Sequence, residues 1–385
     1  MTSYRTHDDH ISPTNSPSPS PSLSPQVEYD DMIQDDDGYY DSDVERAPSV
    51  YSYASSRDGP RLVREVHGRV CNAQNELYAL PADEEECTRI STQHLMLKLA
   101  LSSNYPAPQL VKDALRPAMS KPFFPGLPRR TQERRRQLLD CGTGAGEWAV
   151  EMALEFPEVD VVGVDLAPQF RKKAANAPKN CRFEIDDVTL GMPHFKGTFD
   201  VVHSRSIGNG VQDFPAYIED LLLTLRPGGI LIMCEGDLQL LSNSGPVDPL
   251  LSPLQRLLSA AYGALKAKGS TVDAGRGLAK WLKALQGRRG GTSAVGSHVV
   301  WVPVGGWLPG TDPQSQHLNN LGHLMAQDCQ LFLRSLRPTL LEAGYDPLLL
   351  DSWVLEAESE LARAERGEGG LWCLWHYAYV PPPQP

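Results

Sequence analysis

Residues 138–166 read LLDCGTGAGEWAVEMALEFPEVDVVGVDL, and this stretch is the most informative part of the chain. It contains an apolar strand, a glycine-rich turn, a helix expected over 147–155, and a second apolar run that ends at Asp165. A glycine has no Cβ, so backbone N–H groups in the turn can approach a ligand closely around Gly142, Gly144 and Gly146. The stretch therefore predicts half of a nucleotide-binding βαβ unit.

The spacing of the glycines indicates which nucleotide is bound. A dinucleotide site of the form G-x-G-x-x-G needs its third glycine at position 147, but the sequence has Glu147 there and Gly146 before it. Asp140 lies two residues ahead of the first glycine. D-x-G-x-G-x-G with a later strand-end acid is typical of S-adenosylmethionine (SAM) methyltransferases: the first acid lies near the cationic aminoacyl group, and the second binds the ribose hydroxyls.

Charge is unevenly distributed along the 385-residue chain. Residues 1–60 hold twelve acidic residues and three arginines, and so carry −9 of the formal net charge of −12. The remainder is near neutral and lacks the basic face that phosphate-backbone binding requires, which argues against direct nucleic-acid binding. The seven cysteines are scattered without a C-x-x-C pair, so we expect no metal site and no disulfide framework.

No secretory signal and no apolar run long enough to span a bilayer is found, so we expect no membrane association. Together with the scattered cysteines this predicts a cytoplasmic or nuclear location, or both. The N-terminal segment, with its SPSPSPSLSP repeat and acidic stretch, lacks a hydrophobic period and is expected to be disordered. It offers a route to protein partners, although a solvated tail without a specific role is the simpler interpretation.

Order is expected to begin near Val63. Asp83 and Glu86 form a D-x-x-E helix start, and the helix that follows should pack as a lid or brace. Residues 106–128 are proline-rich and are expected to be irregular. The basic cluster that leads into the first strand is interpreted as solvated: Arg129, Arg130, Arg134, Arg135 and Arg136.

A helix is expected around 169–177 after Asp165, and strands and helices alternate from there on, which predicts a parallel, doubly wound sheet. Strands are expected over 182–185, around TFDVVHSR, and at ILIMCE. The last third is predicted to be more helical, with helices over 254–268, 274–286, 318–343 and 347–366, and strands over 298–304 and 371–379. The final strand is apolar on both faces, so it should lie inside the sheet rather than at its edge.

These motifs in register resemble the class I SAM-dependent methyltransferases, and more narrowly the fungal LaeA-like, or TAM-domain, family. The narrower resemblance rests on HGRVCNAQNELYALPADEEE, FEIDD, FDVVHSR and GGWLP. It implies an α/β, Rossmann-like sheet of seven strands, with the last strand antiparallel between the fifth and sixth, and helical C-terminal additions. We therefore expect a disordered tail, 1–62, and a methyltransferase domain, 63–385, comprising a brace or lid (63–130), a SAM-binding core (131–236) and acceptor-side helices with the last strands (237–385).

The resemblance also implies a set of SAM-binding residues. Asp165 would hold the ribose with Leu166 beside the adenine, and Asp187 with Val188 would meet the adenine, although sequence alone does not show whether Asp186 or Asp187 points inward. The aminoacyl end would be met by Ser204 and Arg205, and the methionine moiety by Asp140, Gly142, Gly144 and Gly146. One departure from the family pattern is G-M-P in the loop after Asp187, where a tryptophan-proline pair is usual.

The acceptor half of the reaction is less explicit. His203 emerges at a strand end facing the donor and is the candidate general base, with a structural histidine as the alternative. Four residues are candidates for an acceptor pocket or for ordinary packing: Tyr78, His94, Trp301 and Trp307. We expect methyl transfer to a small-molecule, secondary-metabolite acceptor. The alternatives are a LaeA-like nuclear regulator acting through protein partners, and a protein methyltransferase.

Overall fold

The computed structural model describes residues 62–116, 135–288 and 295–381, and all of the description below refers to them. The expected tail lies outside these residues apart from Leu62, which is buried. The first described strand is β1 (Val63–Val66), and it pairs with β2 (Arg69–Asn72). No helix in these residues is long and apolar enough to cross a membrane.

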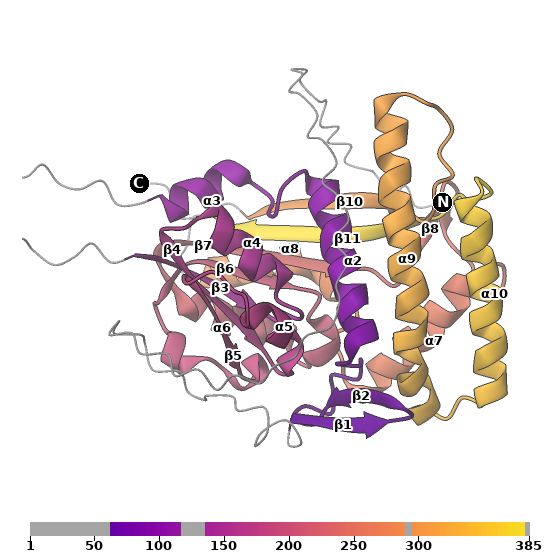
Figure 1. Cartoon of the computed structure of the whole chain (residues 1–385), viewed down its shortest axis with the longest axis horizontal. Helices are drawn as coiled ribbons and strands as arrows, with labels where there is room; N and C mark the ends of the chain where they lie inside the picture. Colours follow the sequence, from indigo (N-terminus) through magenta and orange to yellow (C-terminus); the bar gives the residue numbers. More distant parts are fainter. Residues whose placement is uncertain (1–61, 117–134, 289–294, 382–385) are drawn as a thin grey trace, which may run out of the picture. The chain divides into compact units, whose positions relative to one another are not determined.

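A mixed sheet forms the centre of the described chain (Figure 1). Its strands run in the order β5 (Cys181–Ile185), β4 (Val159–Asp165), β3 (Arg136–Cys141), β6 (Phe199–Arg205), β7 (Leu225–Gly236), β11 (Trp372–Val380) and β10 (Gly296–Pro303). The first five are parallel, and β11 runs antiparallel to both of its neighbours. The predicted seven-stranded order with an inserted last strand is therefore confirmed. A short hairpin, β8 (Leu241–Ser242) and β9 (Gly245–Pro246), adds to one end of β11.

Helices cover both faces of the sheet. On one face α4 (Glu147–Glu155) buries Trp148, Ala149, Met152 and Ala153 at the spacing of a single helical face. It ends before Pro157, since a residue that precedes proline is disfavoured in the helical conformation. On the other face α6 (Phe214–Thr224) and α8 (Ala274–Arg288) pack on β7, and α8 also contacts β11. Burial of each large apolar side chain in these layers stabilises the fold by about 1.5–3 kcal/mol.

Three predicted segments differ in the structure. Residues 108–115 form helix α3 (Pro108–Leu115), so the irregular structure predicted for 106–128 is wrong there; the proline sits at the first helical position, where it is compatible with a helix. The helix predicted after Asp165 is a 3₁₀ turn, η1 (Pro168–Phe170), followed by the short α5 (Arg171–Ala174). In the basic cluster, Arg136 is ion-paired with the buried Asp200 at 2.8 Å; Arg129, Arg130 and Arg134 lie outside the described residues.

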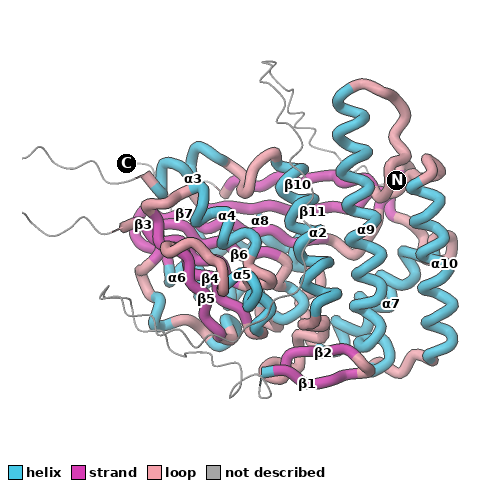
Figure 2. Tube along the Cα trace, in the orientation of Figure 1, coloured by secondary structure: helices cyan, strands magenta, loops and turns pink. Residues whose placement is uncertain are grey.

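The remaining helices pack beside the carboxyl ends of the parallel strands. They are α2 (Glu84–Leu101), α7 (Pro253–Lys268), α9 (Pro313–Glu342) and α10 (Pro347–Glu365). Ser252, Asp312 and Asp346 cap the last three through side-chain hydrogen bonds, and a proline follows each cap. Helix α2 lies against α9, and α7 contacts both α9 and α10, as the tube in Figure 2 also shows. The chain thus builds a helical wall from segments that are far apart in sequence.

Candidate active site

The glycine turn has the backbone conformation that its sequence predicts. Gly142, Gly144 and Gly146 have φ values of 70°, 57° and 87°, all in the left-handed region that favours glycine. A Cβ on Gly144 would lie 3.2 Å from the Ile90 side chain, and one on Gly146 would lie 2.9 Å from the Phe183 ring. Gly142 and Gly144 line the cavity described below. Gly146 instead allows close packing of α4 on β5.

Asp165 holds the turn from the end of β4. Its Oδ2 accepts a hydrogen bond from the Gly144 N–H at 2.7 Å, and its Oδ1 accepts one from Ala167 at 3.0 Å. Burial raises the pKa of Asp165 to about 6, although these two N–H groups favour the ionised form. A carboxylate at this place can accept further hydrogen bonds from hydroxyl groups, since each oxygen has two lone pairs.

Asp140 and His203 are register partners on β3 and β6. The two buried side chains are joined by a 2.7 Å contact between His203 Nδ1 and Asp140 Oδ1, and Thr143 Oγ1 donates to Asp140 Oδ2 at 2.7 Å. The His203 ring stacks on Trp148 with ring centroids 3.7 Å apart. Burial lowers the pKa of His203, against the opposing effect of Asp140. His203 lines the cavity, and both its orientation and its environment are fixed by these contacts.

Asp186 and Asp187, the neighbouring acids after β5, have different partners. Asp187 caps the 3₁₀ turn η2 (Val188–Leu190), because its Oδ1 accepts from Thr189 N at 3.0 Å and from Thr189 Oγ1 at 2.6 Å. Asp186 lies 3.6 Å from His194 Nε2. Both acids line the cavity together with Val188 and Leu166.

Ser204 and Arg205 point in different directions. Ser204 is fully buried, and its hydroxyl lies 2.9 Å from Tyr217 OH of α6, so it is absent from the described cavity lining. Arg205 lines the cavity, and its Nη2 lies 3.1 Å from His94 Nδ1. His94 is buried behind it and lies outside the described lining.

A continuous cavity connects most of the predicted site residues. Its empty volume is about 1610 Å³, part of it open to solvent. It extends past the glycine turn into a chamber between α2, α7, α9 and β11. Nine predicted residues line it: Asp140, Gly142, Gly144, Asp165, Leu166, Asp187, Val188, His203 and Arg205. Of the four acceptor candidates, Tyr78 lines the cavity; Trp301 is 49% exposed, and Trp307 packs edge to face on Trp372.

Sequence reasoning missed Glu235, which lines the cavity at the end of β7. Its side chain is buried and accepts hydrogen bonds from the N–H groups of Ile207 and Gly208 at 2.8 and 3.3 Å. Burial raises the pKa of Glu235 to about 7 despite these two donors. The sequence does contain a signal for a site residue here, because a single acid ends the apolar run ILIMC. Ligands of parallel sheets bind at the carboxyl ends of the strands. Glu235 fixes the loop after β6 against the end of β7.

Sequence reasoning also missed the buried charges on α2. Glu86 and Arg89 are paired at 2.6 Å, and Arg89 Nη1 donates to Asp328 Oδ1 of α9 at 3.1 Å. Ser335 donates to Glu86, and the Phe332 ring covers the Arg89 guanidinium at 5.3 Å. Taken alone, the polar residues of α2 predict a solvent-exposed helix face. Only the packing of α9 against α2 shows that these charged side chains are buried.

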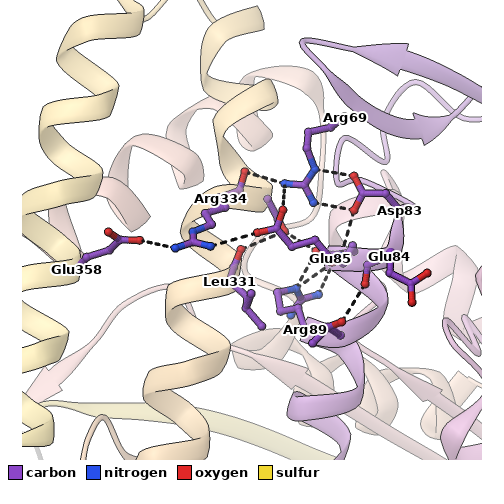
Figure 3. A network of polar contacts seen from close by, with 11 residues as sticks. Arg69, Asp83, Glu84, Glu85, Arg89, Leu331, Arg334 and Glu358 are labelled. Carbon is purple, nitrogen blue, oxygen red and sulfur yellow. Dashed lines mark hydrogen bonds and ion pairs between the residues drawn. The ribbon is translucent and has the colours of Figure 1, made fainter. Parts of the chain in front are cut away.

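Figure 3 shows how the start of α2 is fastened to its surroundings. Arg69 of β2 donates to both Asp83 oxygens at 2.6 and 2.8 Å, and also to the Arg334 carbonyl of α9 at 3.2 Å. Arg334 in turn lies 3.6 Å from Glu85 and 3.1 Å from Glu358 of α10. The first hairpin, α2, α9 and α10 are thereby linked around the chamber.

The residues present fit a nucleoside-bearing donor. The cradle at Gly142 and Gly144 is open to the cavity, and a Cβ on Gly144 would meet Ile90 on the cavity wall. Gln169 is 9% exposed and lines the cavity, and its Nε2 has no hydrogen-bond partner among the described residues. A buried amide without a partner is uncommon, so a ligand atom is its natural acceptor.

Comparison with known proteins decides the family. Residues 132–266 match the family model described as a methyltransferase domain. The chain is 32% identical over 300 residues to the secondary metabolism regulator laeA of Coprinopsis cinerea. The aligned region covers 75% of this chain and 67% of that protein. The chain belongs to the LaeA-like class I SAM-dependent methyltransferases. This LaeA-like methyltransferase is accordingly an enzyme with SAM as its methyl donor.

Two other relatives match a shorter part of this LaeA-like methyltransferase. Methyltransferase pytC of Aspergillus terreus is 31% identical over 193 residues, covering 50% of this chain and 55% of pytC. The protein-methionine methyltransferase laeA of Emericella nidulans is 28% identical over 195 residues, covering 50% of this chain and 46% of that protein. The chain thus spans about half the length of these two relatives. A solved Haemonchus contortus phosphoethanolamine N-methyltransferase 2 is 13% identical over 77% of this chain and 58% of its own, with a TM-score of 0.37.

Proposed function

We propose that this enzyme transfers the SAM methyl group to a small-molecule, secondary-metabolite acceptor. The main observation in support of this proposal is that the cavity does not end at the glycine turn. It continues into a chamber between α2, α7, α9 and β11. A concave, largely apolar space with a few polar groups is the form that small-molecule sites take. The relative named methyltransferase pytC supports an enzyme rather than a purely structural role.

We assign the donor to the end of the cavity nearest β3 and β4. Asp165 would hold the ribose, Asp187 with Leu166 and Val188 the adenine, and the aminoacyl end would meet Arg205. The methionine moiety would lie on the turn formed by Asp140, Gly142, Gly144 and Gly146, with Ser204 behind it. When bound, SAM supplies an electrophilic methyl group on a cationic sulfonium. Seven carboxylates and two arginines line the cavity, a balance that suits a cationic donor.

The transfer needs little chemistry from the protein beyond positioning. Holding donor and acceptor in line lowers the barrier, and a base is needed only if the acceptor loses a proton. His203 remains the proposed base. Its Nδ1 is held by Asp140, and its lowered pKa keeps the imidazole neutral near neutral pH, the form that accepts a proton.

An alternative role is that of a LaeA-like nuclear regulator acting through protein partners, or of a protein methyltransferase. Relatives bear the names secondary metabolism regulator and protein-methionine methyltransferase, and these names favour it. In either role we assign residues 1–62 to a tail, 63–130 to a brace or lid, 131–236 to the donor-binding core and 237–385 to the acceptor side. In the regulator role the tail would bind the partners. A cytoplasmic or nuclear location, or both, suits either role.

A label-transfer experiment separates these roles. Purified full-length protein is incubated with methyl-labelled SAM and, separately, a metabolite extract and a protein extract from the source organism. Label in the small-molecule fraction, lost in Asp165→Ala, is the expected result; label only in protein would overturn the proposal. If deletion of residues 1–60 leaves partner capture unchanged, the tail-based regulator role is excluded.

A further inference from the structure

The acceptor chamber has walls of a distinctive kind. Aromatic and aliphatic side chains from five different segments enclose it: Tyr78, Leu240, Leu258, Met325, Phe332 and Trp375. Three of them present rings, and aromatic faces pack well against flat apolar molecules. Polar groups also line the chamber, and two of them carry information about what binds.

Trp375 has an unused hydrogen-bond donor. The residue lies in the middle of β11, is 4% exposed and lines the cavity, and its Nε1–H has no partner among the described residues. The benzene part of the indole covers Gly236, where a Cβ would lie 3.2 Å from the ring, so the side chain is held in place. A buried N–H left unpaired is costly, and an oxygen atom of a ligand would satisfy it.

Asp328 supplies the complementary group. It is 3% exposed and lines the cavity; its Oδ1 accepts from Arg89 at 3.1 Å and its Oδ2 accepts from Gln93 at 3.3 Å. Each oxygen retains a second lone pair. Arg89 is also paired with Glu86, so one cation faces two carboxylates and the group keeps a net negative charge. A ligand group beside Asp328 must therefore donate a hydrogen, and an anion is repelled.

We propose that the chamber takes an uncharged, planar, apolar acceptor with two polar features: an oxygen that accepts from Trp375 Nε1–H, and a hydroxyl or amine hydrogen that Asp328 accepts. This inference rests on the proposed small-molecule methyltransferase function and specifies the class of its acceptor. Charge and shape select the acceptor together, because the rings admit a flat body and the carboxylate excludes anions.

A matched pair of probes tests the charge preference. The neutral 3-hydroxy-2-naphthamide and the anionic 3-hydroxy-2-naphthoate have nearly the same shape and the same hydroxyl. Calorimetry on the full-length protein saturated with S-adenosylhomocysteine (SAH) should show the amide binding at least tenfold more tightly than the carboxylate. Equal affinity, tighter binding of the carboxylate, or no binding of the amide would overturn the inference.

Two variants test the assigned residues. Trp375→Phe removes the N–H while keeping a ring, and should weaken amide binding about threefold to tenfold. The matched control is Trp301→Phe on β10, where the side chain is 49% exposed and outside the described lining; it should change nothing. Asp328→Asn should reduce the preference for the amide over the carboxylate. Unchanged amide affinity in Trp375→Phe, or an unchanged preference in Asp328→Asn, would contradict the assignment.

SAH affinity measured on the same samples separates the two levels of the proposal. If wild-type protein binds SAH but not the amide, the acceptor class is wrong and the donor site stands. If wild-type protein fails to bind SAH, the proposed function itself is wrong.

Discussion

His203 Nδ1 lies 2.7 Å from Asp140 Oδ1, and the two residues face each other in register across β3 and β6. The other Asp140 oxygen accepts from Thr143 inside the glycine turn. Asp140 therefore connects the turn to the fourth parallel strand, and the stacked Trp148 ring closes the far side of the imidazole. The glycine turn and the candidate base are parts of one hydrogen-bonded unit.

Replacing His203 by Phe keeps the ring stack but leaves Asp140 with one partner fewer. We expect a loss of about 1–3 kcal/mol in the free energy of unfolding, measured by urea denaturation, because a buried carboxylate loses a hydrogen bond. The double variant Asp140→Asn/His203→Phe should lose less than the sum of the two single variants. Additive losses would show that the two side chains are not coupled.

The same histidine predicts an effect of pH. Its pKa is lowered in the folded protein from the ordinary value of 6.5, so the unfolded chain binds a proton first as the pH falls. Stability should therefore decrease as the pH falls through about 6.5 toward the lower folded pKa. The slope of unfolding free energy against pH should be smaller in His203→Phe, and equal slopes would refute this.

Gly144→Ala should impair both folding and donor binding. An alanine at φ 57° is strained by about 1–2 kcal/mol, and its Cβ would lie 3.2 Å from Ile90. Gly197→Ala is the control, because its φ is 63° but no atom lies within 4 Å of the added Cβ. Only Gly144→Ala should weaken SAH binding by calorimetry, and Ile90→Ala should restore part of the stability. Similar SAH affinities in both glycine variants would contradict a cradle at this position.

A pair of alanine substitutions should identify the acid that meets the adenine. We expect Asp187→Ala to lower SAH affinity about tenfold, as for the loss of a hydrogen bond to a charged group, and Asp186→Ala to lower it less than twofold. Asp187→Ala also removes the cap on η2, so a fall in melting temperature should accompany it. The reverse ranking of affinities would assign the adenine contact to Asp186.

Donor binding should depend on the ionisation of Asp165. Since its pKa is raised to about 6, SAH affinity should fall as the pH drops through about 6, where the carboxylate that accepts the ribose hydroxyls is lost. Asp165→Asn should bind about 10- to 100-fold more weakly and without this dependence. His203→Phe serves as the control and should retain it; a flat profile in wild-type protein would exclude Asp165 as the titrating group.

The buried pair on α2 should matter far more than the exposed pair on α9. Arg89→Met leaves two carboxylates in the interior and is expected to cost about 3–5 kcal/mol. Arg334→Met breaks surface ion pairs and should cost less than about 1 kcal/mol. Urea unfolding of both variants gives the comparison, and similar losses would mean that the inner network is not tightly coupled.

Most residues of the proposed donor side could be brought together from sequence because their signals are local. The glycine turn, Asp165 and the strand ending at Arg205 each lie within a few residues of the element that positions them, and nine predicted residues line one cavity. The inserted last strand was also predictable, since β11 is apolar on both faces. Ser204 and Gly146 are the exceptions: alternation along β6 turns the Ser204 hydroxyl toward α6, and Gly146 packs against the Phe183 ring of β5.

The proposed acceptor side could not be predicted because it depends on pairings between distant segments. Arg89 and Asp328 are 239 residues apart, and neither has a local pattern that indicates burial. Helix α2 buries Glu86, Arg89 and Gln93 together with Met96 and Leu97, so a polar sequence covers an interior face. By sequence, Trp301 and Trp307 are equally good candidates for the acceptor pocket. The register of β10 and the loop that follows it place both side chains outside the described cavity lining.

The position of β11 has a consequence for biosynthesis. β10 contacts the sheet only through β11 in the described residues, and β11 follows β3 to β7 and β10 in the chain. During synthesis β3 to β7 can therefore associate before β11 is available to pair, and until then the edge of β7 stays open and the chamber lacks Trp375. Until β11 pairs, the β7 edge is available to chaperones or to other nascent chains.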